Sequence, residues 1–190
     1  WLADPAEEPE PFGDGGTKMA WNTFNVVSIY PNGNPVMSDV NQRWVGDCCA
    51  CAVIASMAYL YPRFVKHIIK DNMDKTYTVT MYDPKGKQIS VGVGGDYFIG
   101  NSGDLGALGG RNKEVTWATI LEKAMIKWNQ IYQGSSNVGG IGTEYVSAIF
   151  TGDGESVGFG ANALIAEDLQ RAVEVSLKQG RLVIGGFTRS

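Results

Sequence analysis

The chain has 190 residues, of which 44% are hydrophobic, and it carries a formal net charge of -4 and one histidine. This length and apolar content predict a folded protein with one sizeable core, or a large half of a two-lobed protein. The acidic balance, without a Lys/Arg cluster long enough to follow a phosphate backbone, argues against a nucleic-acid partner, and no apolar run reaches membrane-spanning length.

The N-terminal segment is acidic and rich in Pro and Gly, opening with WLADPAEEPEPFGDGG. Such a composition buries too little apolar surface to fold alone. Residues 1–20 are therefore predicted to be an extended arm or a propeptide remnant. A plain disordered terminus is equally consistent with this sequence. A start at Trp1, without initiator Met or signal peptide, suggests a processed protein or part of a longer chain. The folded domain is predicted over residues 21–190, beginning with a short strand or extended segment at Trp21–Ile29 and a turn at 31–35.

The stretch QRWVGDCCACAVIASMAYLY, from Gln42 to Tyr61, carries the strongest chemical signal. Gly46 and Asp47 break the backbone, and the small and apolar residues that follow predict a buried helix with Asp47 as its N-cap. Cys48 then lies in the first turn, where the helix dipole favours the thiolate, as in cysteine-nucleophile enzymes. Gln42 is close enough for its side-chain amide to join the Cys48 backbone N–H as a second oxyanion donor.

A purely structural interpretation of the same helix stays open. Free cysteine behaves as a small hydrophobe, so a C-C-A-C run in an apolar helix also fits a core; the upstream Gln42 and Gly46-Asp47 favour catalysis at Cys48. Cys49 and Cys51 are interpreted as core, because these positions do not converge on one metal and no second Cys/His pair completes a zinc site. Neighbours along a helix point apart, so a disulfide framework is not expected.

After Pro62, apolar residues at helical spacing predict a short amphipathic helix over Arg63–Asn72. This helix carries His67, the only histidine. The preceding helix extends about 20 Å, so His67 reaches Cys48 only if the second helix folds sharply back. A half-exposed structural histidine is therefore predicted.

The segments Tyr77–Tyr82 and Gln88–Val93 flank the turn DPKGK and predict a β-hairpin. The glycine-dense segment GVGGDYFIGNSGDLGALGG follows, at residues 92–110. It lacks the strand-to-helix context of a phosphate-binding loop, so it is predicted to be a mobile surface loop. It either borders a substrate cleft or is a tolerated insertion.

Helical periodicity returns in Val115–Tyr132, where one apolar face predicts a helix that packs on the core. The pair Glu122-Lys123 within it is interpreted as surface charge. The Gly/Ser-rich segment 134–160 is predicted to be a loop with a single helical turn at Glu144–Phe150.

The last predicted elements are an amphipathic helix and a strand. The helix covers Ala166–Gln179 and stops at Gly180, and the strand begins with the buried-strand pattern Leu182-Val183-Ile184.

Two blocks of this sequence resemble the calpain-type cysteine peptidases. Gln42-x-x-x-Gly46-Asp47-Cys48 with its Ala/Ser-rich helix is similar to the family's nucleophile segment, and Trp117-x-x-x-Leu121-Glu122-Lys123-Ala124-x-x-Lys127 resembles a second signature. The resemblance covers roughly Ser28 to Phe187 and departs at Cys49, where the family usually has Trp. It implies an α+β fold: a papain-like, mostly helical nucleophile lobe with a β-hairpin and the first strand of a second lobe.

The resemblance also implies a possible calcium requirement. Asp39 lies nine residues before Cys48, at the offset of an acidic calcium ligand of the family, with backbone carbonyls supplied by the loop from Asn32 to Asn34. Glu144 aligns best with the second carboxylate, and hard oxygen ligands on a flexible loop suit Ca²⁺. In the alternative, Asp39 caps a turn and Glu144 is a solvated surface acid.

The activity implied by the resemblance is endopeptidase cleavage of proteins or peptides through the Cys48 thiolate and an acyl-enzyme. Such an enzyme also needs a base and a group that orients it. The family's His and Asn follow the strand that matches Leu182–Phe187, so neither is assigned in this chain. The expected source is a C-terminal segment or a second chain, produced by autoproteolytic processing of a zymogen near Ser190.

Two other functions stay open. Cys49 in place of Trp fits a calpain-like interaction module that has lost catalysis, and the same scaffold fits a thiol acyltransferase. A trimmed chain that starts at Trp1 suits a secreted or surface peptidase of a bacterium, whereas calpain-like enzymes are often cytoplasmic.

Overall fold

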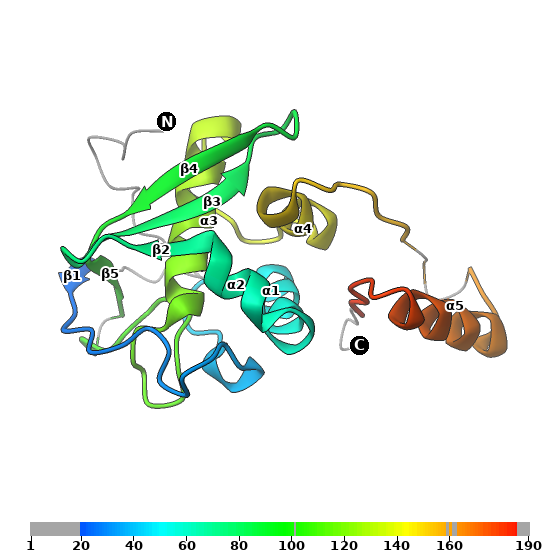
Figure 1. Ribbon diagram of the computed structural model, residues 1–190, viewed down its shortest axis with the longest axis horizontal. Coiled ribbons are helices and arrows are strands. Elements are labelled where there is room, and N and C mark those ends of the chain that lie inside the picture. Colours follow the sequence, from blue (N-terminus) through cyan, green and yellow to red (C-terminus); the bar gives the residue numbers. More distant parts are fainter. Residues whose placement is uncertain (1–19, 101, 159, 161–162, 186–190) are drawn as a thin grey trace.

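The computed structural model describes residues 20–100, 102–158, 160 and 163–185, and its helices and two small antiparallel sheets confirm the α+β class (Figure 1). Most of the expected arm, residues 1–19, lies outside the described residues. One long helix crosses behind the larger sheet, and the remaining helices gather to one side of it (Figure 1). The site residues therefore sit on elements that share one core.

The larger sheet has the order β2 (Ile69–Asp71), β3 (Tyr77–Tyr82) and β4 (Gln88–Val93), all antiparallel. The β3–β4 hairpin has the predicted bounds. Its turn is fixed locally, because the Asp83 carboxylate accepts the backbone N–H groups of Lys85 and Lys87, and Gly86 takes a φ of 76° that favours glycine.

The second predicted helix, Arg63–Asn72, is too long. The observed helix α2 covers Pro62–Ile68 with Pro at its start, and the chain then becomes strand β2. The backbone of Ile69–Asp71 pairs with Tyr77–Val79 of β3. Ile69 is β-branched and fits a sheet. Pairing with the distant strand β3 therefore determines the structure of Ile69–Asp71, although the apolar residues have helical spacing.

The glycine-dense segment 92–110 is not a mobile surface loop. It contains β5 (Asp96–Ile99), which pairs with β1 (Ala20–Thr23), a strand shorter than the predicted Trp21–Ile29. Beyond β5, Leu105 and Leu108 are buried in the core. Glycine serves close packing here: a Cβ atom on Gly109 would lie only 2.5 Å from Leu105 Cδ2 and 2.6 Å from the carbonyl oxygen of residue 114.

Helix α3 (Trp117–Gln133) forms the centre of the molecule and is buried on almost every side. Thr116 caps its start by accepting the Ala118 N–H, and Gly134 ends it in the left-handed conformation. The interpretation of Glu122 and Lys123 as surface charge is wrong, because both side chains are buried. Lys123 Nζ donates to the carbonyl oxygen of residue 96 at 2.6 Å, and Glu122 Oε2 accepts the Leu108 N–H at 2.9 Å.

Three elements frame the predicted nucleophile. Helix α1 (Cys48–Leu60) starts at the expected residue, a short 3₁₀ helix η2 (Met37–Asp39) packs against it, and α4 (Thr143–Thr151) contacts its other side. Where a single turn was predicted, α4 has nine residues. Its buried Val146, Ile149 and Phe150 explain the extra length, since tertiary packing stabilises short helices.

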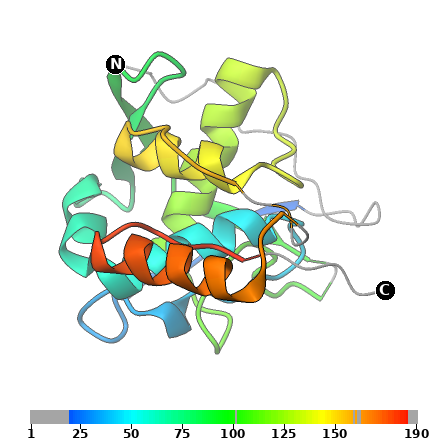
Figure 2. The ribbon, with the colours of Figure 1, turned by 90° about the vertical axis from the view of Figure 1, so that its right-hand side faces the viewer.

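Helix α5 (Ala166–Lys178) buries no residue and lies in the foreground of Figure 2, in front of the other helices. A cavity of about 950 Å³ is lined by residues of α1, α4 and α5. The predicted strand after α5 is not formed at residues 182–185, which pair with no strand of the described chain, and Phe187 lies outside the described residues.

No single helix in the described ranges is both long and apolar enough to cross a membrane. The pair α1 and α2 passes that test only when taken together, and it is bent by 113°.

Candidate active site

Cys48 is the first residue of α1, and its side chain is exposed. The thiol therefore lies at the helix N-terminus and is accessible from solution, as the sequence predicts. Asp47 holds the N-cap position, but its side chain makes no capping hydrogen bond. With φ at -105° and ψ at 38°, its backbone is outside the extended region typical of a capping residue, and its carboxylate is buried, with 1% of the residue exposed.

Beneath the start of α1, Asp47 meets a second buried carboxyl group. Glu122 of α3 is hydrogen-bonded to Asp47, and its Oε2 accepts the Leu108 backbone N–H at 2.9 Å. Burial, and next the charge of Asp47, raise the pKa of Glu122 well above its ordinary value. The protonated form of Glu122 is therefore favoured, and the pair of carboxyl groups ties α3 to the residue before Cys48.

Sequence reasoning missed this pair, because Trp117–Gln133 has the pattern of a helix with one apolar and one polar face, and only the tertiary structure buries the polar face as well. A carboxyl group buried on this helix needs a partner, because an unpaired buried charge is costly. The neighbouring Lys127 follows the same rule: its Nζ donates to the carbonyl oxygen of residue 92 at 3.0 Å, and burial lowers its pKa to about 8.

Gln42 lies on the exposed approach to α1, and its Nε2 donates to the Val45 carbonyl oxygen at 2.9 Å. The side-chain amide of Gln42 has two N–H donors, so the second one can donate to a substrate oxygen. The backbone on both sides of Gln42 is fixed, since Asn41 N–H donates to residue 109 at 3.0 Å and Trp44 N–H to residue 106 at 3.1 Å. The glycine-dense segment 92–110 thus supports the backbone around Gln42, the predicted oxyanion donor.

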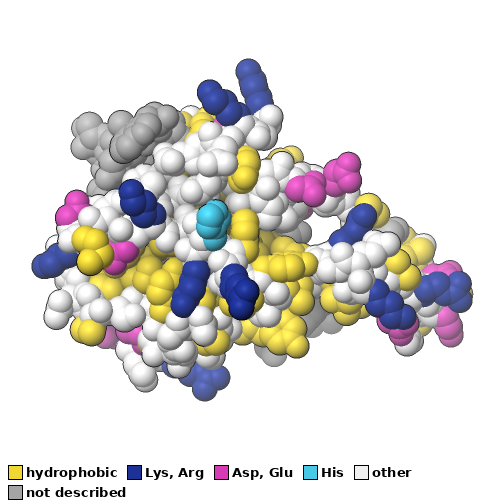
Figure 3. Space-filling model, viewed as in Figure 1, with side chains coloured by type: hydrophobic (Ala, Val, Ile, Leu, Met, Phe, Trp, Pro, Cys, Tyr) yellow, Lys and Arg dark blue, Asp and Glu magenta, His cyan; other side chains and the backbone are white. Residues whose placement is uncertain are grey.

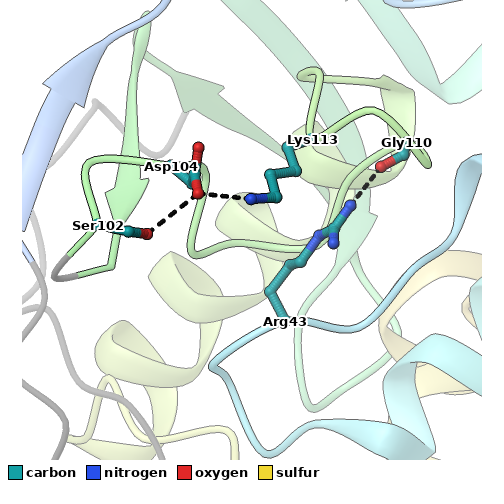
Figure 4. A network of polar contacts seen from close by, with 5 residues as sticks. All are labelled: Arg43, Ser102, Asp104, Gly110 and Lys113. Atoms are coloured by element: carbon teal, nitrogen blue, oxygen red, sulfur yellow. Dashed lines mark hydrogen bonds and ion pairs between the residues drawn. The ribbon is translucent and has the colours of Figure 1, made fainter.

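A polar network extends this support to the outer side of the loop (Figure 4). Arg43 Nη2 donates to the Gly110 carbonyl oxygen at 2.5 Å, and Asp104 accepts from Ser102 at 3.1 Å and from Lys113 at 2.5 Å. The Lys113–Asp104 pair is about half exposed, so water screens it and it contributes little stability of its own. The Arg43 contact matters more for the site because it joins the residue after Gln42 to the loop.

Cys49 and Cys51 are half-buried, so the core interpretation holds only in part. Cys49 is hydrogen-bonded to Cys48, and Cys51 Sγ donates to Asp47 Oδ1 at 3.5 Å. Burial first, then the charge of Cys48 for Cys49 and of Asp47 for Cys51, raises the pKa of both thiols. Both therefore stay protonated at neutral pH, which leaves Cys48, the one exposed thiol of the three, as the candidate nucleophile.

His67 is not brought to Cys48. It lies in the last turn of α2 and is exposed on the surface, in line with the prediction of a structural histidine that is partly open to solvent (Figure 3, cyan). From Cys48 to Leu60 the chain rises by about 20 Å, and α2 turns from that direction by 113°. His67 thus remains beyond the far end of α1.

Asp39, the expected calcium ligand, is buried with 2% of its residue exposed. Its Oδ1 accepts from Asn32 Nδ2 at 2.8 Å, and its Oδ2 accepts from Val36 N–H at 3.2 Å and from Trp117 Nε1 at 2.7 Å. Three N–H donors thus occupy the positions around this carboxylate where a cation would lie. The arrangement matches the alternative in which Asp39 caps a turn.

The other expected calcium ligands lie in two places. Asn34 lines a shallow cavity with Tyr59 and Pro62, at the C-terminal end of α1. Glu144 is exposed in the first turn of α4, and its charge acts on Cys49, at the other end of α1. The donors present therefore do not fit one calcium ion, the calcium site stays a prediction, and no chemical step below uses it.

The comparison with known proteins agrees with this geometry. The model of a family described as calpain family cysteine protease matches residues 21–187, a range that includes Gln42, Cys48 and Glu122. Among curated proteins, none matches the chain. The match spans both sheets, the helix that presents the exposed cysteine and the helix that supports it. The chain thus belongs to the calpain family of cysteine proteases.

Proposed function

We propose that this chain is the nucleophile-bearing, papain-like lobe of an endopeptidase. The observation that carries the proposal is the exposed Cys48 at the first position of α1, within the range that matches the family. The carboxyl pair of Asp47 and Glu122 supports it, because that pair fixes the residue before the nucleophile to the core. The substrates are proteins or peptides.

In the proposed reaction, the Cys48 thiolate attacks a peptide carbonyl carbon. The negative charge that develops on the carbonyl oxygen is stabilised by the Cys48 backbone N–H and the Gln42 amide. The leaving amine takes a proton from a histidine, and the acyl group stays on sulfur as a thioester. Water, deprotonated by the same histidine, then releases the acid and restores Cys48.

That histidine comes from outside these 190 residues. His67 is unsuitable because it is exposed beyond the far end of α1. A histidine and an asparagine that orients it arrive on a C-terminal segment or on a second chain. Native mass spectrometry of the protein as isolated, followed by denaturation, tests this source. A released second chain, or a longer single chain, that contains histidine is expected, and an active 190-residue chain without either contradicts the proposal.

The chemical class is tested with the native protein and a peptidyl epoxide, which traps nucleophilic thiols. Labelling of Cys48, together with hydrolysis of an unmodified peptide, is the expected result. A competing amine added to the same reaction separates hydrolysis from acyl transfer, since a transferase converts most of the acyl group to amide. An unreactive Cys48 in the intact protein instead supports an interaction module without catalysis.

Gln42→Ala is expected to lower kcat by about a hundredfold with little change in KM, because an oxyanion donor acts mainly in the transition state. Steady-state hydrolysis of a fluorogenic peptide measures both constants. Gln88→Ala, which replaces an exposed glutamine at the far hairpin, is the matched control and should change neither. Turnover of the Gln42 variant within about twofold of wild type removes Gln42 from the oxyanion hole.

A further inference from the structure

The first turn of α1 contains a second chemically active pair, Cys48 and Cys51. Residues three apart lie on the same face of a helix, with Cβ atoms about 5–6 Å apart, whereas consecutive residues are about 100° apart around the axis. Cys48-Cys49-Ala50-Cys51 thus has the C-x-x-C spacing of thiol redox motifs at a helix N-terminus. We propose that Cys48 and Cys51 form a reversible disulfide that switches the nucleophile off under oxidising conditions.

The local backbone permits the closure. A disulfide needs Cβ atoms about 3.8 Å apart, so the pair has to approach by roughly 2 Å. Cys51 is fixed, because its N–H donates to the Asp47 carbonyl oxygen at 3.0 Å. Cys48 is the first helical residue and follows Gly46 and the N-cap Asp47, whose side chain makes no capping hydrogen bond, so little holds Cys48 in the helical conformation.

The surroundings of the two thiols give them different roles in forming the disulfide. Cys48 is exposed, so an oxidant from solution reaches it first. Cys51 is half-buried, and its thiol already donates to Asp47 Oδ1 at 3.5 Å. Its raised pKa protects it from direct oxidation, and Asp47 is in place to accept its proton when it reacts.

The reaction needs a hydroperoxide as oxidant. The Cys48 thiolate attacks one peroxide oxygen, the O–O bond breaks, and sulfenic acid and hydroxide are formed. Cys51 sulfur then attacks the Cys48 sulfur and the S–O bond breaks. Asp47 accepts the Cys51 proton and passes it to the departing hydroxyl group, which leaves as water. In total two thiols lose two electrons and two protons, and the peroxide becomes two waters. A small dithiol reverses the reaction by thiol–disulfide exchange.

The disulfide keeps Cys48 at an oxidation state that can be reduced. Without Cys51, sulfenic acid proceeds to sulfinic acid, which dithiols do not reduce. The regulatory meaning of the pair rests on the proposed peptidase function, whereas formation of the bond does not. The two claims therefore have separate readouts.

The direct test is mass spectrometry of the intact native protein after mild hydrogen peroxide treatment, alkylation of remaining thiols and tryptic digestion. The peptide between the cleavage sites at Arg43 and Arg63 contains all three cysteines and no other basic residue. One internal disulfide and one alkylated thiol are expected in it. In Cys49→Ser the disulfide still forms, and in Cys51→Ser or Cys51→Ala it is absent and Cys48 carries sulfinic acid.

Peptidase activity gives the second readout. After peroxide and then dithiol, wild type and Cys49→Ser should recover to within about twofold of untreated protein, whereas both Cys51 variants should recover less than about a tenth. A disulfide in Cys51→Ser, a disulfide between two molecules, or equal recovery in all variants overturns the proposal. An inactive protein that still forms the Cys48–Cys51 bond contradicts only the peptidase function, and an active peptidase without the bond contradicts only the switch.

Discussion

Cys48→Ala is expected to lower kcat/KM for peptide hydrolysis at least about a thousandfold, because removal of a covalent nucleophile leaves only the residual effects of binding and the oxyanion donors. The fold should be retained, since Cys48 is exposed and does not belong to the hydrophobic core. The measurement is steady-state hydrolysis by the intact protein with its histidine-bearing part, combined with labelling by a peptidyl epoxide. Both signals should vanish together.

Cys49→Ser is the matched control, because it removes the adjacent thiol from the same turn. It should keep kcat/KM within about fivefold of wild type, since the raised pKa of Cys49 already keeps that thiol protonated. The assignment is wrong if Cys49→Ser abolishes labelling while Cys48→Ala retains it. If neither variant changes hydrolysis, the activity comes from another part of the protein.

The second large effect concerns stability. Glu122→Ala should lower the free energy of unfolding by about 3 kcal/mol, because it leaves Asp47 and the Leu108 N–H buried without the carboxyl group they now contact. Urea denaturation followed by tryptophan fluorescence measures this change. Glu167→Ala, at an exposed position of α5, is the control and should stay within about 0.5 kcal/mol of wild type. A loss below about 1 kcal/mol for Glu122→Ala contradicts a supporting role for the pair.

Glu122→Gln separates the hydrogen bonds from the ionisation. Because the folded-state pKa of Glu122 is raised above 4.5, the folded protein binds more protons than the unfolded chain at higher pH. This group therefore makes stability fall as pH rises above about 4.5, until the folded form also ionises. Glutamine still accepts the Leu108 N–H and donates to Asp47 but does not ionise, so the decline between pH 5 and 8 should become smaller. An unchanged pH dependence shows that Glu122 is not the group that titrates.

The local signals in the sequence predicted the elements that are determined locally. The β3–β4 hairpin has its predicted bounds because hydrogen bonds to the Asp83 carboxylate and the positive φ of Gly86 determine the turn locally. Helix α1 begins at Cys48, because Gly46 and Asp47 interrupt the chain just before a run of helix-compatible residues. The placement of Gln42 and Cys48 follows from these local features together with the family resemblance.

The errors arise where distant contacts decide. Ile69–Asp71 becomes a strand only because β3 lies beside it, and the sequence around it shows helical spacing. Gly109 is required by the close approach of Leu105. From composition alone, the high glycine content of this segment suggested a flexible loop. Glu122 is paired with Asp47, which lies far from it in the sequence, so no local pattern reveals this partner.

The complete enclosure of α3 also has a consequence for the order in which the protein loses structure. A helix that is buried on nearly all sides opens only when the layers around it separate, so its amide hydrogens exchange with solvent through global unfolding. Helix α5 buries nothing and opens alone at small cost. Helix α3, which carries Glu122 beneath Cys48, therefore belongs to the part of the molecule that unfolds last and as one unit. Local fluctuations near the C-terminal helix leave the geometry around Cys48 intact.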